Sequence, residues 1–394
     1  MAQTECFMEK KHYKIVYVTP ALYMAGGVER VLTLKANYFA DFFDYDITVV
    51  ITEGKGKPVF YPLSKKIKVI NLDVNFEELW HCSFSRKVWL YLYKQHLFKR
   101  KLTTELMQIR PDITISLLRR EINFINEIKD GSKKIGEIHI NRANYRNFDE
   151  HESNFLKRQF AKIWSRNLVG HLRKLDHFVV LTEKDREAWV ELDNVSVIPD
   201  PLPFIPVSVS RLTEKRVVAV ARYSYEKGID LLLRAWADFE HLNKEWRLDV
   251  YGDGDRSVYE QMIDDLKINR DRCCLNGRTT NVEEIYCNSS VFVLTSRFEG
   301  FGMVIIEAMA CGLPVVAFDC PWGPRSIIKD GEDGILVKNG DVRTLAQRLS
   351  YLTSDHILLN VMAQKAVENV KRFYIDKIAS EWNLLFQGLE DKRC

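Results

Sequence analysis

The sequence lacks any long apolar segment. Its first residues, MAQTECFMEKKHYK, contain no apolar core of the kind that a signal peptide requires. No later segment reaches about eighteen uninterrupted apolar residues, the length at which a membrane-spanning helix is considered. We therefore expect neither export nor a membrane span, and we predict a cytoplasmic protein, with the inner face of the cytoplasmic membrane as a further location.

Cysteines at metal-ligand spacing are also missing. Among the eight cysteines only Cys273 and Cys274 lie close together, and these two are adjacent. Scattered cysteines are typical of reduced thiols in a cytosolic protein. The net charge of +3 is small for a general nucleic-acid binder, and no base-reading motif accompanies the local basic clusters. Nucleic acid is therefore not expected as a partner.

The length and the hydrophobic pattern indicate two α/β domains. The 394 residues exceed what one hydrophobic core usually supports. Short runs of branched aliphatic residues alternate with helical patterns, which favours parallel βαβ units. Strands are expected at residues 14–18, 47–51, 68–71, 113–117, 134–138, 177–181, 195–198, 216–221, 247–251, 273–275, 291–294, 314–318 and 334–337. The sequence therefore predicts two Rossmann-like, doubly wound domains.

A proline-rich segment separates the two groups of strands. Residues 199–206 contain four prolines in eight positions and cannot continue a regular element. The expected division is an N-terminal domain of residues 1–198 and a C-terminal domain of residues 199–374. The last helix, at about 375–394, is expected to pack back across the hinge because apolar residues recur on it at helical spacing. They are Ile378, Trp382, Leu385 and Phe386.

The most informative segment is SRFEGFGMVIIEAMACGLPVV, which begins at Ser296 and runs from a strand end through a loop into a helix. Glu299 precedes the helix start, and Glu307 follows eight residues later. Amides at a helix N-terminus can bind diphosphate oxygens, while a carboxylate accepts hydrogen bonds from sugar hydroxyls. A second carboxylate two turns along can reach a ribose diol. The alternative is that Glu299 caps the helix and Glu307 is a solvated helix residue.

Two basic residues, Arg222 and Lys227, follow the strand expected to end at Ala221. A diphosphate that leaves a sugar develops negative charge as the bond breaks. Two fixed cations would stabilise that charge more in the transition state than in the ground state. The alternative is an exposed basic pair on either side of Glu226.

Two further positions lie at predicted strand ends. Gly26 and Gly27 stand between the first strand and its helix, but the full G-x-G-x-x-G spacing is missing, so a dinucleotide site is poorly supported. His139 follows the strand at 134–138, where ligand-facing residues of open sheets gather. The alternative for Gly26 and Gly27 is that they only permit a tight turn. The alternative for His139 is a hydrogen-bonded histidine in a loop.

The string EGFGMVIIEAMACGLPVV resembles the donor-binding signature of glycosyltransferase family 4, whose fold is called GT-B. The Gly-Gly loop, the Ile-Pro-Asp-Pro hinge, the strings ARYSYEKG and YGDG, and the closing helix follow in the family's order. The resemblance covers most of the chain and is stronger in its C-terminal half. It implies an α/β GT-B fold, two Rossmann-like domains facing a central cleft, and a retaining, metal-independent glycosyltransferase with no cofactor beyond its sugar-nucleotide co-substrate.

The resemblance also implies roles for individual residues. Glu299 would bind donor-sugar hydroxyls, Glu307 would bind the ribose, and His139 would contact the donor sugar. The predicted catalytic set is Arg222, Lys227, Glu299 and His139. The predicted donor-binding set is Gly26, Gly27, Arg278, Phe301, Gly302, Met303, Val304 and Glu307. Asp253-Gly-Asp255 has the spacing of a D-x-D metal clamp, but it ends a strand and opens a helix, so we predict a turn and no metal.

Two segments, residues 84–101 and 155–174, are basic and aromatic, each with six Lys or Arg and no acid. Helices of this kind can lie on an anionic membrane surface, with Trp89 or Trp164 among the headgroups. Such a peripheral association would give access to a lipid-linked acceptor. The alternative is a solvated basic face whose apolar residues turn inward.

The segment DCPWGPRSII, which begins at Asp319, resembles the family members that assemble surface polysaccharides and lipid-linked oligosaccharides. On that basis we expect transfer of a hexose or N-acetylhexosamine from a nucleoside diphosphate sugar, UDP-linked rather than GDP-linked, to a glycan on polyprenyl diphosphate. A GT-B sugar-nucleotide epimerase, which would need no acceptor, is one alternative. A non-catalytic subunit that binds the sugar nucleotide without turnover is the other.

Overall fold

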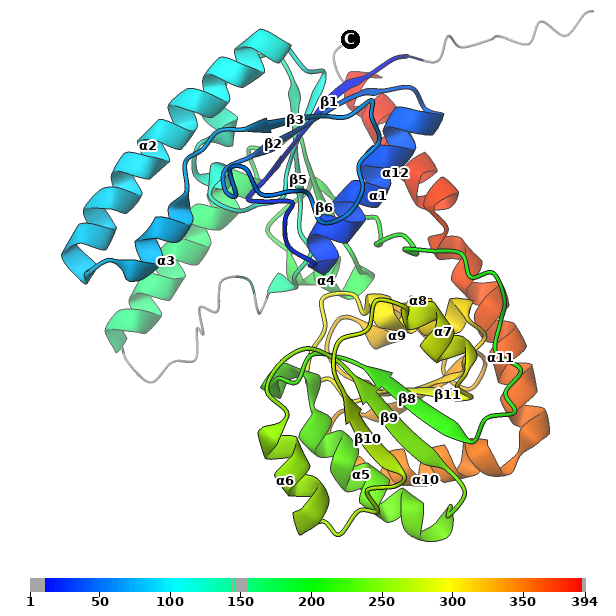
Figure 1. Cartoon of the computed structure of the whole chain (residues 1–394). Helices are drawn as coiled ribbons and strands as arrows, with labels where there is room; N and C mark the ends of the chain where they lie inside the picture. The colour runs from blue at the N-terminus through cyan, green and yellow to red at the C-terminus, as the bar shows by residue number, and fades with distance from the viewer. Residues whose placement is uncertain (1–10, 143–144, 146–154, 392–394) are drawn as a thin grey trace, which may run out of the picture.

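The computed structural model describes residues 11–142, 145 and 155–391 (Figure 1). The prediction that the first residues are not a signal peptide concerns mainly residues 1–10, which lie outside the described residues. Within the described part, thirteen strands form one seven-stranded and one six-stranded sheet, and every pairing between them is parallel. The predicted fold class, two Rossmann-like α/β units, is therefore confirmed.

The first sheet has the strand order β3-β2-β1-β4-β5-β6-β7. Its strands are β1 (Lys14–Thr19), β2 (Asp46–Ile51), β3 (Lys68–Asn71), β4 (Ile113–Ser116), β5 (Lys133–Glu137), β6 (His177–Val180) and β7 (Val195–Val197). The order reverses between β1 and β4, so ligands are expected beyond the carboxyl ends of these two strands.

Helices cover both faces of this sheet, so alternate residues of β1 enter different cores. Val16 and Val18 pack with α2 (Phe84–Ile109) and α3 (Phe155–Leu172). Ile15 and Tyr17 pack with the helices on the other face, α1 (Gly27–Phe42) and α12 (Ile375–Asp391). The short helix α4 (Glu183–Ala188) follows β6. In the part of the chain that is described, no helix is both long and apolar enough to cross a membrane.

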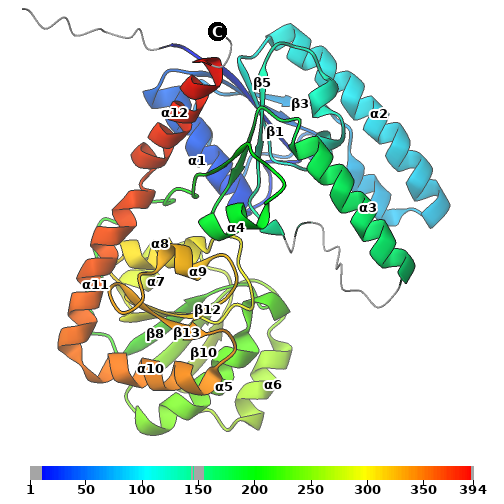
Figure 2. The ribbon, with the colours of Figure 1, turned by 180° about the vertical axis from the view of Figure 1, so that it is seen from behind.

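The last helix, α12, lies beside α1 although the two are more than three hundred residues apart in the sequence (Figure 2). Its residues Ile378, Trp382 and Phe386 are buried in the core of the first sheet, and Leu385 packs against that core. The chain thus returns to the first sheet after completing the second. The exact boundary at residues 198 and 199 stays a prediction.

The second sheet has the order β10-β9-β8-β11-β12-β13. Its strands are β8 (Arg216–Val220), β9 (Arg247–Tyr251), β10 (Cys273–Asn276), β11 (Val291–Leu294), β12 (Val315–Asp319) and β13 (Gly334–Lys338). Its helices are α5 (Ile229–Leu242), α6 (Ser257–Asp265), α7 (Val282–Cys287), α8 (Met303–Ala310), α9 (Pro324–Ile327), α10 (Val342–Ser354) and α11 (His356–Val370). Because β8 and β11 are neighbours at the reversal of order, the loops that follow them meet.

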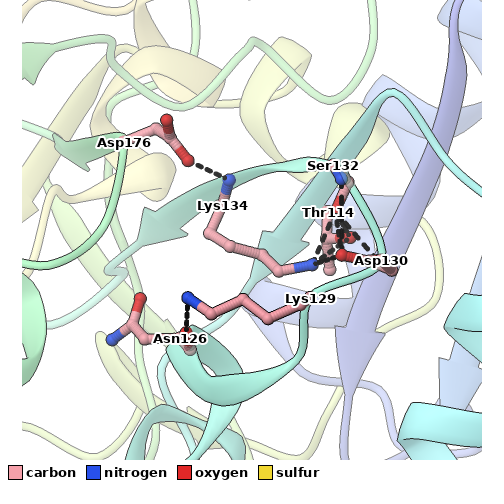
Figure 3. A network of polar contacts seen from close by, with 7 residues as sticks. All are labelled: Thr114, Asn126, Lys129, Asp130, Ser132, Lys134 and Asp176. Carbon is pink, nitrogen blue, oxygen red and sulfur yellow. Dashed lines mark hydrogen bonds and ion pairs between the residues drawn. The ribbon is translucent and has the colours of Figure 1, made fainter.

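A polar network stabilises the amino-terminal ends of β4 and β5 in the first sheet (Figure 3). The buried Lys134 Nζ lies 2.5 Å from Asp130 Oδ1, 2.6 Å from Ser132 Oγ and 3.4 Å from Thr114 Oγ1. Asp176, just before β6, accepts a 2.8 Å hydrogen bond from the Lys134 backbone N–H. Burial lowers the pKa of Lys134, and Asp130 opposes that change. The network therefore ties the starts of β4 and β5 to the residue before β6.

We expect Lys134→Met to destabilise the fold by about 3 kcal/mol, because removal of one partner leaves the buried Asp130 carboxylate without its cation. The free energy of unfolding from urea titration measures this loss. Lys129→Met is the matched control, since within the described part of the chain its exposed Nζ bonds only the Asn126 carbonyl oxygen, at 3.2 Å. Equal, small changes in the free energy of unfolding for both substitutions would contradict a stabilising role of the Lys134–Asp130 ion pair.

Candidate functional site

The carboxyl ends of the two sheets face each other, and loops from both make direct contact. The Asn141 side-chain amide, after β5, donates a 3.0 Å hydrogen bond to the Glu299 carbonyl oxygen, before α8. A Cβ added to Gly300 would lie 2.7 Å from the His139 carbonyl oxygen, so only glycine allows this approach. The predicted site residues therefore lie around a gap between the sheets.

Lys227 and Glu299 form an ion pair at this gap. The Lys227 Nζ donates to Glu299 Oε1 at 2.7 Å and to Oε2 at 2.9 Å. The Ser296 hydroxyl donates a further 2.6 Å bond to Oε1. The Glu299 side chain is only 8% exposed, so these donors replace the hydrogen bonds that water would otherwise give its oxygens. The two residues meet because the loops after β8 and β11 are neighbours.

Arg222 does not join this pair. Its side chain is 69% exposed, and its Nη2 donates a 3.0 Å hydrogen bond to Glu226 Oε1. The structure therefore brings Lys227 to Glu299 and leaves Arg222 at the surface. Arg222 lies beside Glu226, as in the alternative of an exposed basic pair. A long arginine side chain can turn inward when an anion supplies a better partner than the partly buried Glu226.

The entrance of α8 has the form of an anion site. Gly302, the residue before the helix, has φ +103°, a conformation that favours glycine. Among the described residues, no side chain caps the N-terminus of α8, and the first turn of this helix contains no Asp or Glu. Phe301 is buried below it, while Met303 and Val304 are partly exposed. The first N–H groups of a helix in this state are available to a ligand and favour negative charge.

Glu307, one turn into α8, is buried and paired across the gap. Its Oε1 accepts a 2.8 Å hydrogen bond from Arg30 Nη1, and its Oε2 accepts a 3.3 Å bond from the Tyr286 hydroxyl. Burial raises the pKa of Glu307, while Arg30 and Tyr286 act in the opposite direction. Arg30 belongs to α1, beside the first sheet. The alternative of a solvated residue at this position is wrong.

The glycine pair lies on the other side of the same gap. Gly26 precedes α1, and a Cβ there would meet Glu29 Oε2 at 2.0 Å. A Cβ on Gly27 would lie 3.8 Å from Met303 Sδ. The start of α1 thus lies opposite the start of α8. A side chain at position 27 would extend into the space between the two helix ends.

Arg278 also reaches toward the first sheet. Its guanidinium carbon lies 5.3 Å from the centre of the Phe60 ring, in the loop between β2 and β3. Asp253 and Asp255, by contrast, accept backbone hydrogen bonds of 2.9 Å from Gly254 and Ser257 within one turn. These bonds use the two carboxylates to shape the turn that opens α6.

His139 lies inside a buried cluster of four charges. Its Nε2 is 3.1 Å from Glu137 Oε1, and its Nδ1 is 3.2 Å from Asp200 Oδ1 in the proline-rich hinge. Lys35 of α1 pairs with the same Glu137 oxygen and is fully buried. Its Nζ also lies 4.5 Å from the ring centre of Trp382 in α12. The cluster therefore links the first sheet, α1, α12 and the hinge.

The four charges balance one another. Burial alone lowers the pKa of His139, but Asp200 and Glu137 outweigh it and raise the pKa to about 9. Burial raises the pKa of Glu137, but Lys35 and His139 outweigh it and lower the pKa to about 2. Three of these side chains, Glu137, His139 and Asp200, are close enough to share a metal ion. With two cations already paired to two carboxylates, they need none for neutrality.

Several residues of the site were not predicted. Arg30, Asn141 and Tyr286 lie in no motif, and Asp200 lies in the Ile-Pro-Asp-Pro string, which was given no role in the site. Arg30 had the clearest signal, since it lies on the first turn of the helix that the glycine pair opens. Its partner could not be inferred, because that contact depends on how the two sheets face each other.

We expect the stability contributed by His139 to fall as pH rises. Its folded-state pKa is raised above the ordinary 6.5, so the contribution is complete below pH 6.5 and is lost as pH rises through about 9. At about 1.4 kcal/mol for each pKa unit, the loss is roughly 3 kcal/mol. The measurement is the difference in unfolding free energy between wild type and His139→Gln from pH 6 to 9.5. A difference independent of pH would contradict a charged His139.

Part of the chain matches a known protein family. Residues 204–369 match the family described as Glycosyl transferases group 1. The chain is 35% identical over 227 residues to an exopolysaccharide phosphotransferase of Streptomyces coelicolor, but this match covers 56% of the chain and only 24% of that protein. It is 26% identical over 362 residues to an uncharacterized glycosyltransferase of Haemophilus influenzae, covering 91% of the chain and 95% of that protein.

A third relative is a Campylobacter jejuni α-1,4-N-acetyl-D-galactosaminyltransferase whose name includes a glycan on PP-undecaprenol. It is 26% identical over 383 residues, which is 94% of this chain and 97% of that protein.

Solved structures share the fold. Sucrose-phosphate synthase from Thermosynechococcus elongatus superposes with a TM-score of 0.77 at 19% identity, covering 97% of this chain and 100% of that one. The Anabaena protein HepE, solved with UDP and glucose, gives a TM-score of 0.70 at 18% identity, covering 95% and 100%. Residues 204–369 thus match the group 1 glycosyltransferases, and the chain is similar over nearly its whole length to relatives named as glycosyltransferases and to solved structures with two facing Rossmann-like sheets.

Proposed function

We propose that this glycosyltransferase moves a hexose or N-acetylhexosamine from a UDP-sugar to a glycan on polyprenyl diphosphate, during assembly of a surface polysaccharide. The observation that carries the proposal is the pairing of Lys227 with the buried Glu299 beside the uncapped start of α8. A cation from the loop after β8, together with a carboxylate and helix amides from the loop after β11, suits a diphosphate and a sugar together.

In the proposed complex, the diphosphate lies at the α8 entrance and Lys227 turns from Glu299 to the phosphate oxygens. Glu299 is then released to accept hydrogen bonds from the sugar hydroxyls. Glu307 exchanges Arg30 for the ribose diol, and Arg222 turns inward to the phosphates. Each carboxylate keeps a hydrogen-bonded partner throughout, which limits the desolvation cost of binding.

Transfer would then proceed on one face of the sugar. The bond between the anomeric carbon and the diphosphate oxygen breaks while the acceptor oxygen bonds to the same carbon. The acceptor proton passes to the departing phosphate oxygen, so no separate protein base is required. Lys227 and Arg222 stabilise the charge that develops on the diphosphate, and closure of the gap excludes water. This pathway retains the anomeric configuration.

The preference for UDP and for a lipid-linked acceptor is supported by relatives. HepE was solved with UDP, and the name of the Campylobacter relative includes a PP-undecaprenol glycan. The exposed apolar side chains of α2 add a physical argument. Trp89 and Leu92 are 67% and 61% exposed and lie beside Val88 and Tyr93, and the rings of Trp89 and Tyr93 stack at 5.8 Å. Such a surface would place the acceptor side at the inner face of the cytoplasmic membrane.

We expect Lys227→Ala, Arg222→Ala and Glu299→Gln each to lower kcat, because each removes a contact with the diphosphate or the sugar. The loss for Lys227→Ala should be about 100- to 1000-fold, as for removal of one donor to a developing oxyanion. The assay measures transfer from a panel of UDP- and GDP-sugars, and melting temperatures verify that each variant is folded.

Lys244→Ala is the control for this series, since it removes an exposed lysine of the same domain outside the gap. Wild-type rates in all three variants would discard the site assignment.

We expect Trp89→Ser with Leu92→Ser to weaken binding to vesicles that contain phosphatidylglycerol, since both remove exposed apolar area next to the basic residues Arg86 and Lys87. Co-sedimentation should fall several-fold, and binding by wild type should fall as salt is raised. Leu242→Ser, at an exposed leucine of the other domain, should change nothing. Equal binding by all three proteins would contradict the membrane surface.

A further inference from the structure

Two cysteines lie in contact where helices α7 and α8 end. Cys287 is the last residue of α7, and Cys311 directly follows α8. Their side chains are hydrogen-bonded to each other. Both thiols are free in the structure, and Cys287 is partly exposed whereas Cys311 is buried. The pair therefore combines a thiol that solvent can reach with a second, buried thiol beside it.

A short strap that follows the proline-rich hinge, residues 207–210, bonds to both cysteines. The Cys287 thiol donates a 3.1 Å hydrogen bond to the Ser208 carbonyl oxygen. The Ser210 backbone N–H donates a 2.8 Å bond to the Cys311 carbonyl oxygen. Because the strap is bonded to the ends of both helices, it holds the two cysteines in one arrangement.

The cysteine pair also adjoins the buried carboxylate Glu307. Tyr286, immediately before Cys287, donates its 3.3 Å hydrogen bond to Glu307 Oε2. The Cys311 backbone N–H donates a 3.2 Å bond to the Glu307 carbonyl oxygen. A change in the distance between the two sulfur atoms is therefore transmitted to Glu307 through one residue of α7 and one turn of α8.

The two thiols differ in how readily they react. A thiol reacts with an oxidant as its thiolate, and burial raises the pKa of Cys311. The partly exposed Cys287 is therefore the sulfur that an oxidant attacks first. Cys311 is then in place to attack the oxidised sulfur of its neighbour. An accessible thiol in contact with a resolving thiol is the arrangement found in redox-sensing cysteines of reducing compartments.

We propose that Cys287 and Cys311 form a reversible disulfide with hydrogen peroxide as the oxidant, and that this bond separates Tyr286 from Glu307. In the first step the Cys287 sulfur bonds to a peroxide oxygen, the O–O bond breaks, and the departing hydroxide takes the thiol proton and leaves as water. In the second step the Cys311 sulfur displaces hydroxide from the resulting sulfenic acid, and this hydroxide takes the Cys311 proton. Two thiols are thus oxidised by two electrons, and one peroxide is reduced to two waters.

The effect on Glu307 follows from the covalent bond. A disulfide holds two sulfur atoms closer than a hydrogen bond between thiols does, so the ends of α7 and α8 are drawn together. Oxidation also removes the hydrogen that Cys287 donates to the strap. The Tyr286–Glu307 bond, at 3.3 Å, is already long for a bond from a hydroxyl, so a small shift of α7 breaks it. Because Glu307 is the proposed ribose ligand, this second part rests on the proposed function.

The disulfide is tested by treating the intact chain with hydrogen peroxide and mapping unreduced peptides by mass spectrometry. Wild type should give a Cys287–Cys311 cross-link that dithiothreitol reverses. In Cys311→Ser the sulfenic acid on Cys287 loses its resolving thiol and should be trapped by dimedone, whereas Cys287→Ser should give neither product. Cys274→Ser, at an exposed cysteine outside the pair, should cross-link as wild type does.

A dimedone adduct on wild-type Cys287 without the cross-link would overturn the disulfide, and so would an unreactive Cys287. Melting temperatures of the reduced proteins verify that the variants are folded. If Cys311→Ser is unfolded, the comparison of wild type with Cys287→Ser still decides the question, because position 287 is partly exposed and tolerates serine.

The effect on Glu307 is tested by calorimetric binding of UDP to the reduced and the oxidised chain. The Kd should rise by about threefold on oxidation, as for loss of one hydrogen bond, and recover on reduction. It should not change when Cys287→Ser is treated with peroxide. An equal Kd in both states of wild type would overturn the effect on Glu307. Failure of the reduced wild type to bind UDP would count against the proposed function, whereas the mapped cross-link would still decide the disulfide.

Discussion

Two buried carboxylates at the start of α8 are the constraint on which the site depends. A carboxylate removed from water must keep a cation or several hydrogen-bond donors, and removal of one partner from a buried pair is costly. Glu299 is held by Lys227 from its own sheet, and Glu307 by Arg30 from across the gap. In the proposed complex, a sugar nucleotide supplies hydroxyls and phosphates in place of both cations, so that binding would exchange partners without leaving a charge alone.

The same principle connects the two halves of the molecule. Lys35 and His139 neutralise Glu137 and Asp200, and Asp200 belongs to the hinge that leads to the second sheet. Trp382 brings α12 against Lys35, so the returning helix shares this balanced cluster. Hinge, first sheet and closing helix are thereby fixed together, and the carboxyl ends of both sheets are held toward one gap.

Much of this arrangement was predicted from the sequence, because the positions of the strands follow from local pattern. Every predicted strand occurs, with each bound shifted by at most one residue, since branched aliphatic runs between helical patterns mark buried parallel strands well. The contact of Lys227 with Glu299 follows from a doubly wound order, which makes β8 and β11 neighbours. The pairing of Arg30 with Glu307 could not be predicted, because it depends on how two separately folded sheets face each other. The exposed direction of Arg222 likewise reflects a local competition with Glu226 that composition does not reveal.

The most direct test of the central claim is the position of UDP in a crystal structure of the complex. The account predicts that the ribose hydroxyls bond the Glu307 carboxylate in place of Arg30, with the diphosphate at the first turn of α8 and Lys227 turned toward it. A uridine nucleotide bound outside this gap, with Lys227 still on Glu299 and Arg30 still on Glu307, would contradict it.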